Sequence, residues 1–316
     1  MNKKYFIIAF VFALAAAAIG GGALKYSSWQ KSLTTNGEPT FANTRNKMSY
    51  LGKIKITSPD NGEINLYRQD GMWRFAEAKN YFANLRQLSN LLKMINDSQI
   101  IATDEANPNL LKKHQLDKNS GILLQTYALD GTMFDQIIIG KKEKNNICYA
   151  RLPQSAKYMH RISDCNLFSA QTADWMPYPL LTIPYYLLER IKTAETELYH
   201  DEIIDKIMHS KNMRLFVLAI SNLDYQGIIF KEELITDESL NPKSRQIEIE
   251  MADGLEYILT IYEADDSYWL DLAMKVGNIA HKSVPEFIEK NHKYFDKWLF
   301  QLSDKQGKLL FNFRGQ

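Results

Sequence analysis

A long uncharged segment near the N-terminus, Tyr5 to Leu24, places the strongest constraint on what this 316-residue chain can be. Lys3 and Lys4 precede the segment, and few cations follow it closely. A helix needs about 20 apolar residues to cross roughly 30 Å of hydrocarbon, so residues 5–24 can span a membrane. The lysine pair predicts that the N-terminus stays inside and that the body of the chain is exported. We therefore expect a single-pass anchor.

A cleaved signal peptide is the alternative interpretation of the same segment. Asn2, Lys3 and Lys4 would form its charged region, and the small residues Ala16 to Ala18 would offer a cleavage site. Both interpretations export the remaining chain. A mature protein lacking residues 1–18 or 1–23 would exclude the anchor.

The composition of the chain predicts a globular body without a charged binding surface. Hydrophobic residues make up 45% and aromatic residues 12%, and the length is sufficient for two domains with cores of their own. Lys and Arg total 38 against 37 Asp and Glu, a net charge of +1. Because this balance produces no long-range positive field, we expect no nucleic-acid partner.

Alternating apolar and polar residues, separated by turn sequences, predict two sheet-rich halves with a few amphipathic helices. The fold class is therefore α+β, with a diverged internal duplication as one option because helix followed by meander occurs in both halves. The predicted organisation is an anchor or signal peptide at 1–25, a tether at 26–48, a first α+β domain at 49–173, a Pro/aromatic linker at 174–186 and a second α+β domain at 187–316.

The expected elements follow from these local patterns. In the first half they are strands at 52–57, 63–68 and 72–75, a helix from Phe82 to Ile95, a polar loop around Asn107, and strands at 121–128, 132–140, 146–152 and 157–162. In the second half they are a strand at 189–194, a polar helical zone at 195–210, a helix at 213–223, strands at 245–251, 255–263 and 268–275, and a helix from Ser283 that runs into Trp298 and a polar tail.

The two cysteines, Cys148 and Cys165, both belong to the exported part of the chain. The predicted hairpin places Cys148 opposite residues 162–164, so Cys165 is close. An oxidising compartment would permit a disulfide between them. Two unpaired buried thiols, or a reactive or metal-binding thiol, are the alternatives.

Motifs for enzymatic chemistry are absent from the sequence. No His-Glu-x-x-His, Cys-x-x-Cys, Gly-x-Ser-x-Gly, phosphate-binding loop or dinucleotide fingerprint occurs, and we expect no cofactor. A hydrolase would need a catalytic cluster that only folding assembles. The one weak metal candidate is Glu197, Asp201, Asp205 and His209, which would share a helix face at spacings of four, although a solvated face is the commoner use of such a pattern.

Aromatic residues gather with proline between the predicted halves. Trp175, Tyr178, Tyr185 and Tyr186 lie in a stretch whose prolines exclude a continuous helix or central strand. A packed linker is the usual role of such a stretch, and a recognition surface is the other.

The order of short motifs along the exported part resembles the bacterial domain-of-unknown-function family numbered 4340. Nearly the whole exported part is covered, except residues 195–211, which depart from the family's pattern. The motifs are Asp70-Gly71-Met72-Trp73, Asn84-Leu85-Arg86, Asn107-Pro108, His114-Gln115-Leu116, Ile139-Gly140-Lys141, Tyr149-Ala150-Arg151-Leu152, Asp174-Trp175, Leu180-Leu181-Thr182-Ile183-Pro184, Ser221-Asn222-Leu223-Asp224-Tyr225, Asp253-Gly254-Leu255, Tyr268-Trp269-Leu270 and Trp298-Leu299-Phe300-Gln301-Leu302.

The resemblance implies a membrane-anchored envelope protein of the bacterial inner membrane, with most of its chain in the periplasm. Members of the family look like accessory components, often associated with transporters of the ATP-binding-cassette type, and no catalytic residues carry over. The expected function is that of a non-enzymatic accessory or adaptor protein with a membrane-protein partner. The alternative is a module that binds an envelope glycan, peptide or lipid through aromatic residues, which a pocket lined by Trp and Tyr would favour.

Overall fold

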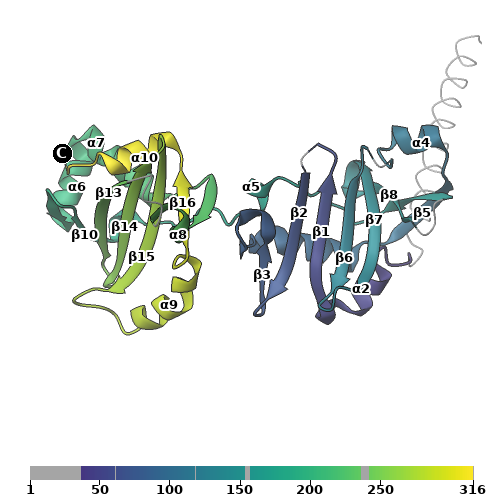
Figure 1. Ribbon diagram of the computed structural model, residues 1–316, viewed down its shortest axis with the longest axis horizontal. Coiled ribbons are helices and arrows are strands. Elements are labelled where there is room, and N and C mark those ends of the chain that lie inside the picture. The colour runs from purple at the N-terminus through teal and green to yellow at the C-terminus, as the bar shows by residue number, and fades with distance from the viewer. Residues whose placement is uncertain (1–36, 61, 118, 154–156, 236–241, 316) are drawn as a thin grey trace, which may run out of the picture. The chain divides into compact units, whose positions relative to one another are not determined.

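The computed structural model describes residues 37–60, 62–117, 119–153, 157–235 and 242–315. Their strands form two antiparallel sheets, one of nine strands and one of seven, and helices occur among the strands along the chain (Figure 1). The predicted α+β class is confirmed. Within this described part, no helix is long and apolar enough to span a membrane. The predicted anchor at residues 5–24 lies outside the described residues.

Contacts divide the described chain into two units, and neither is continuous in sequence. The first comprises residues 37–65 and 88–170, and the second comprises residues 66–87 and 171–315. Both β2 (Gly62–Gln69) and α3 (Leu85–Asp97) begin in one unit and end in the other. The predicted domains are consecutive segments, so they do not include this exchange of residues 66–87 into the second unit. The exchange depends on which distant residues contact each other.

The first unit contains six strands of its own. The alternating patterns predict five of them, and the strand at residues 100–105 is one that the sequence did not indicate. The nine-stranded sheet has the order β4-β3-β2-β1-β6-β7-β8-β9-β5. The elements within this unit are α2 (Ala42–Asn46), η1 (Met48–Tyr50), β1 (Leu51–Ser58), β5 (Ile100–Glu105), α4 (Pro108–Lys113), β6 (Ile122–Ala128), β7 (Met133–Lys142), η3 (Lys144–Asn146), β8 (Cys148–Arg151) and β9 (Tyr158–Ile162). Figure 1 shows β1, β6 and β7 side by side.

One face of this sheet is buried and the other is partly open. Alternate residues in the middle of β1, β6 and β7 are buried, among them Ile56, Leu124 and Ile137. The helix α3 buries Leu91 and Met94 on its apolar side, as its spacing predicts. The residues between, such as Leu123 on β6, belong to the other face.

The predicted tether at 26–48 is wrong for the part that the structure describes. Phe41 and Thr44 are fully buried, and Thr44 hydrogen-bonds to Asp135 of β7. Residues 37–48 therefore belong to the first unit, and only residues 26–36 lie outside the described part. The composition of this stretch is polar, but one buried aromatic and one buried hydroxyl are enough to fix it in place.

The predicted loop around Asn107 contains a short helix instead. Asn107 is the N-cap of α4, because its Oδ1 accepts a hydrogen bond from the Leu110 N–H at 2.9 Å, and Pro108 occupies the first turn. The sequence Asn-Pro thus begins a helix here rather than a turn.

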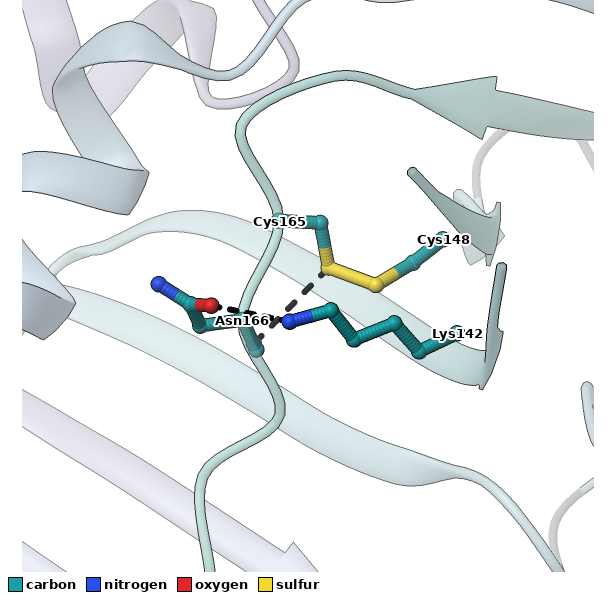
Figure 2. Close-up of a disulfide and its surroundings, with 4 residues drawn as sticks. All are labelled: Lys142, Cys148, Cys165 and Asn166. Atoms are coloured by element: carbon teal, nitrogen blue, oxygen red, sulfur yellow. Dashed lines mark hydrogen bonds between the residues drawn. A yellow bond between two sulfur atoms is a disulfide. The ribbon is translucent and has the colours of Figure 1, made fainter. Parts of the chain in front are cut away.

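Cys148 and Cys165 form a disulfide in the first unit, the first of the three states that the sequence left open (Figure 2). Cys148 pairs with Ile162 across the β8–β9 ladder, as the predicted hairpin requires. Cys165 lies three residues beyond Ile162, and its N–H donates to the carbonyl of Asn146. The bond ties the loop after β9 to the start of β8.

The second unit is built on a seven-stranded sheet with the order β11-β10-β13-β14-β15-β16-β12. Its elements are β3 (Met72–Phe75), η2 (Ala76–Ala78), β4 (Tyr81–Phe82), α5 (Thr172–Trp175), η5 (Tyr185–Leu187), β10 (Leu188–Lys192), β11 (Glu197–Tyr199), α6 (His200–His209), α7 (Lys211–Ser221), β12 (Gly227–Phe230), α8 (Lys231–Ile235), β13 (Lys243–Met251), β14 (Leu255–Ala264), β15 (Ser267–Val276), α9 (Val284–Asn291), η6 (His292–Tyr294), β16 (Trp298–Leu302) and α10 (Asp304–Phe311). Its core is the buried face of β13, β14 and β15 (Figure 1).

Three local predictions in the second unit are wrong, and one strand was not predicted. Phe82 is a strand residue, not the start of α3. Residues 298–302 form β16 between β15 and β12, and the predicted polar tail is α10. Residues 227–230 form a strand that the sequence did not indicate. These short segments become strands because they complete the hydrogen bonds of distant neighbours, which local pattern cannot show.

Candidate functional site

An aromatic cavity of about 630 Å³ lies in the second unit. We call it the aromatic cavity and define it by its lining residues. These come from the β2–β3 turn, β3, β4, the start of α3, residues 177–180 of the proline-rich linker (the proline segment), and the end of α9 with the residues that follow. They are Gly71, Met72, Trp73, Tyr81, Phe82, Ala83, Asn84, Leu85, Arg86, Pro177, Tyr178, Pro179, Leu180, Asn291, Tyr294 and Phe295. Its volume is in the range of small-molecule sites.

The turn that presents Trp73 requires an unusual backbone. Asp70 and Gly71 both have positive φ, at 52° and 75°, which is the geometry of a tight two-residue hairpin and suits the sequence Asp-Gly. The turn leads directly into β3, so Trp73 is held on a strand with a fixed register against Arg68. A strand positions an aromatic ring more rigidly than a loop does.

Tyr81 forms the buried wall of the aromatic cavity. Its ring packs edge-to-face on Trp298 at 5.1 Å and on Phe300 at 5.6 Å, and its hydroxyl donates to the Tyr294 carbonyl at 3.1 Å. Burial raises the pKa of this hydroxyl far above its ordinary value. Tyr81 is therefore a neutral packing residue and a poor candidate for acid–base chemistry.

Phe82 and Asn84 continue this wall of the aromatic cavity toward α3. The Arg74 guanidinium lies over the Phe82 ring at 4.4 Å, and the Tyr294 ring lies 4.5 Å from Phe82 on another side. Asn84 caps α3, because its Oδ1 accepts from the N–H groups of Arg86 and Gln87. Its Nδ2 donates to the Met176 carbonyl, which joins this wall to the proline segment.

The lining of the aromatic cavity carries little charge. Arg86 is its one charged side chain, and no carboxylate lines it among the described residues. The other polar side chains of the lining are those of Trp73, Tyr81, Asn84, Tyr178, Asn291 and Tyr294, and the Tyr81 hydroxyl and the Asn84 amide already donate to backbone carbonyls. Flat aromatic faces with a few polar edges suit a ligand that stacks and hydrogen-bonds, and they offer no acid–base pair for a reaction.

The sequence located one member of this lining. Tyr178 lines the aromatic cavity and is 63% exposed, with its hydroxyl accepting from the Asn222 amide. Tyr185 and Tyr186 are also exposed, at 49% and 62%, but they pack on each other outside the cavity. Trp175 is only 1% exposed, so its prediction as part of a binding surface is wrong.

Trp175 is buried because the linker is part of the second unit's packing. Its carbonyl accepts from the Asn84 N–H at 2.7 Å, next to the cap of α3. Sequence reasoning missed Trp73, Phe82 and Tyr294, which folding brings together. The distance in sequence explains this, since the bonded pair Tyr81 and Tyr294 is 213 positions apart.

The four candidate metal ligands do not share a helix face. Glu197 lies on β11, where its carboxylate pairs with Arg190 at 3.0 Å, because α6 begins only at His200. Asp205 and His209 do lie one turn apart on α6, 3.2 Å from each other and exposed. The described residues contain no group of three or more His, Cys, Asp or Glu placed to hold a metal ion.

A separate ion-pair network surrounds Arg190 on the seven-stranded sheet. Its guanidinium contacts Glu250 at 2.9 Å and Glu197 at 3.0 Å, and Glu256 beneath it is bound by Lys275 at 3.0 Å. The pKa of Arg190 is raised: burial opposes the shift, and the bonds to Glu250 and Glu197 outweigh it. The charges are paired with one another, so we assign this network to the sheet's stability.

Comparisons of the chain with protein-family models, with curated proteins and with solved structures find no match. The resemblance described above therefore stays a prediction, and the candidate site rests on the geometry of the aromatic cavity.

Proposed function

We propose that this protein is a non-enzymatic, membrane-anchored periplasmic protein that binds an envelope glycan in the aromatic cavity. It would act as an accessory component of an envelope complex in the bacterial inner membrane. The family resemblance is the ground for proposing an ATP-binding-cassette transporter as that complex. Residues 5–24 would supply the membrane anchor.

Two observations support the location. The uncharged segment 5–24 follows a lysine pair, which favours export of the body. The disulfide between Cys148 and Cys165 is consistent with an oxidising compartment outside the cytoplasm.

The aromatic cavity is the observation that carries the binding function. Sugar rings have flat faces of C–H groups and edges of hydroxyls, and Trp73, Tyr178 and Tyr294 offer flat faces of matching polarity. The Arg86 guanidinium would donate to the hydroxyl edges, and the Asn291 amide oxygen would accept from them, since the Asn291 Nδ2 already donates to the Phe287 carbonyl at 2.7 Å. This favours the binding alternative over an adaptor that recognises partners through its outer surface alone.

The binding test uses the full chain in lipid nanodiscs, titrated with a β-1,4-linked N-acetylglucosamine tetramer and separately with a proline-rich peptide. We expect the tetramer to bind and Trp73→Ala to weaken its binding about tenfold, because one stacking face is lost. Tyr186→Ala is the matched control, since it removes an exposed aromatic ring that does not line the cavity. Binding of the peptide alone, or equal tetramer affinity in Trp73→Ala and wild type, would overturn the glycan proposal.

The anchor has its own test. We expect the intact mass of the membrane-extracted protein to include residues 1–24, and the protein to resist alkaline extraction from membranes. A mature form that begins after residue 18 or 23 would contradict the anchor and leave the binding proposal standing.

A further inference from the structure

A second cavity lies on the open face of the first unit's sheet, and one row of side chains forms its floor. Thr57 of β1 pairs with Leu123 of β6, Leu123 pairs with Ile138 of β7, and Ile138 pairs with Arg151 of β8. Directly paired residues point to the same face of a sheet, so these four side chains form a straight row across four strands. We call this row and the space above it the strand-row cavity.

The strand-row cavity has a volume of about 610 Å³ and a polar–apolar–apolar–polar floor. Pro59 and Pro153 line its sides, and Asp117 and Gln136 supply further polar groups. Ile138 also packs under Leu116 and its neighbours, which fixes the floor against the rest of the unit. A rigid strand-based floor of this size fits a small ligand lying across the strands.

The Thr57 hydroxyl, at one end of the row, lacks a hydrogen-bond partner in the described part of the chain. Its Oγ1 is buried and has no hydrogen-bond partner among the described residues. A buried hydroxyl without a partner lowers stability, so native proteins rarely leave one unless water or a ligand supplies the bond. The hydroxyl therefore marks one end of the row as a place for a polar ligand atom.

The charged groups of the cavity are one cation and one anion. Arg151 ends the row on β8, and a guanidinium carries five N–H donors in a geometry that suits a carboxylate. Asp117 lies in the loop before β6, where its Oδ1 accepts from the Asn119 N–H at 2.8 Å.

We propose that the strand-row cavity binds a small zwitterion with an apolar body, of the class of short apolar peptides. The ligand's carboxylate pairs with Arg151 and its ammonium group with Asp117. Its apolar side chains lie on Leu123 and Ile138, and a backbone polar group bonds to the Thr57 hydroxyl. No part of this proposal depends on the aromatic cavity.

The test compares three forms of one ligand, the dipeptide Leu-Phe, against the full chain in nanodiscs by calorimetry. The free dipeptide has both charges, its C-terminal amide has only the ammonium group, and its N-acetyl form has only the carboxylate. We expect the free dipeptide to bind about tenfold more tightly than either derivative, since each loses one charge-assisted bond.

Variants then assign each charge to its partner. Arg151→Gln should weaken binding of the free dipeptide and the N-acetyl form and leave the amide unchanged. Asp117→Asn should weaken binding of the free dipeptide and the amide and leave the N-acetyl form unchanged. Arg161→Gln is the matched control, because Arg161 lies on β9 of the same sheet and does not line the cavity. Thr57→Val should weaken all three forms.

The comparison in the wild type keeps the proposal testable even where a variant fails to fold. Equal affinity for the three forms, or no binding of the free dipeptide, would overturn it. Tighter binding of the N-acetyl form than of the free dipeptide would overturn the role of Asp117 and with it the zwitterion.

Discussion

At the scale of single residues, a buried polar network ties the N-terminal part of the described chain to the first unit's sheet. The Asp135 carboxylate accepts from the Thr44 N–H at 2.7 Å, from the Thr44 hydroxyl at 2.6 Å and from the Asn43 amide at 3.1 Å. The Thr44 hydroxyl also lies 2.6 Å from that of Thr126. Thr44 of α2 is buried together with Thr126 and Asp135, so each of these groups depends on the others.

We predict that Asp135→Ala lowers the free energy of unfolding by roughly 3 kcal/mol, because two buried donors of Thr44 lose their acceptor. Urea denaturation should show a lower midpoint with an unchanged slope. Asp104→Ala is the control, since Asp104 is exposed on β5 and its loss should change stability by less than about 0.5 kcal/mol.

Two histidines of the first unit should make its stability depend on pH. Burial, followed by the charge of Lys113, lowers the pKa of His114, which stacks on Tyr149 at 3.7 Å. Burial also lowers the pKa of His160, whose Nδ1 lies 2.9 Å from the Thr103 hydroxyl. Both imidazoles therefore bind a proton less readily in the folded protein than in the unfolded chain.

The direction of the pH effect follows from these lowered values. Below about pH 6.5 the unfolded chain binds protons that the folded unit still excludes, so stability falls as the pH drops from there toward the folded pKa values. Above about pH 7 the contribution is fully present. Urea midpoints between pH 5 and 8 should show this fall in the wild type and a flatter profile in His114→Gln/His160→Gln.

At the scale of elements, α10 is packed too closely on β15 for any side chain at one position. Gly307 lies in the middle of α10, and a Cβ there would lie 2.2 Å from the Tyr268 Cβ. Alanine would gain about 1 kcal/mol in helix propensity. The clash involves an atom bonded to the backbone of a central strand, which has little freedom to move.

We predict that the clash prevails and that Gly307→Ala destabilises the second unit by roughly 2 kcal/mol. Lys305→Ala on the exposed side of the same helix should have no such effect. Thermal unfolding compares the two variants. A stabilised Gly307→Ala protein would contradict the packing of α10 on Tyr268.

The disulfide should contribute to the first unit in proportion to the loop that it closes. Cys148 and Cys165 are 17 positions apart, and a loop of this size predicts about 3 kcal/mol from the restricted unfolded chain. Reduction of the wild type should lower the urea midpoint, and Cys148→Ala/Cys165→Ala should match the reduced protein without reductant. A reductant effect in the double variant would indicate another cause.

At the scale of the whole molecule, residues 66–87 belong to the second unit although the surrounding sequence belongs to the first. The contacts of Tyr81 attach residues 66–87 to the second unit. Its ring is buried among Trp298, Phe300 and Tyr225, and the Trp298 indole N–H donates to the Lys79 carbonyl next to it.

We predict that Tyr81→Ala destabilises the second unit by about 3–5 kcal/mol, and that Tyr81→Phe, which keeps the ring, costs about 1 kcal/mol. Tryptophan fluorescence reports the change, because every tryptophan among the described residues belongs to the second unit: Trp73, Trp175, Trp269 and Trp298. Tyr50→Ala, at an exposed site of the first unit, is the control. An unchanged fluorescence transition in Tyr81→Ala would contradict the exchange.

The sequence by itself determined the elements whose signals are local. Alternation and turn residues predicted β1, β2 and β3, the β8–β9 hairpin and the β13–β15 meander, because side-chain period and turn chemistry act within a few residues. The same reasoning located Tyr178 and the two cysteines. The segment 5–24 also belongs here, since only its length and lack of charge support the proposed anchor.

Only the tertiary structure decided the features that depend on distant partners. Residues 298–302 are a strand because β15 and β12 lie on either side. Trp175 is buried within the second unit, where its carbonyl accepts from the Asn84 N–H. The aromatic cavity and the strand-row cavity are both of this kind. Each is formed by side chains far apart in sequence, whose meeting depends on strand pairing and burial rather than on any pattern that neighbouring residues share.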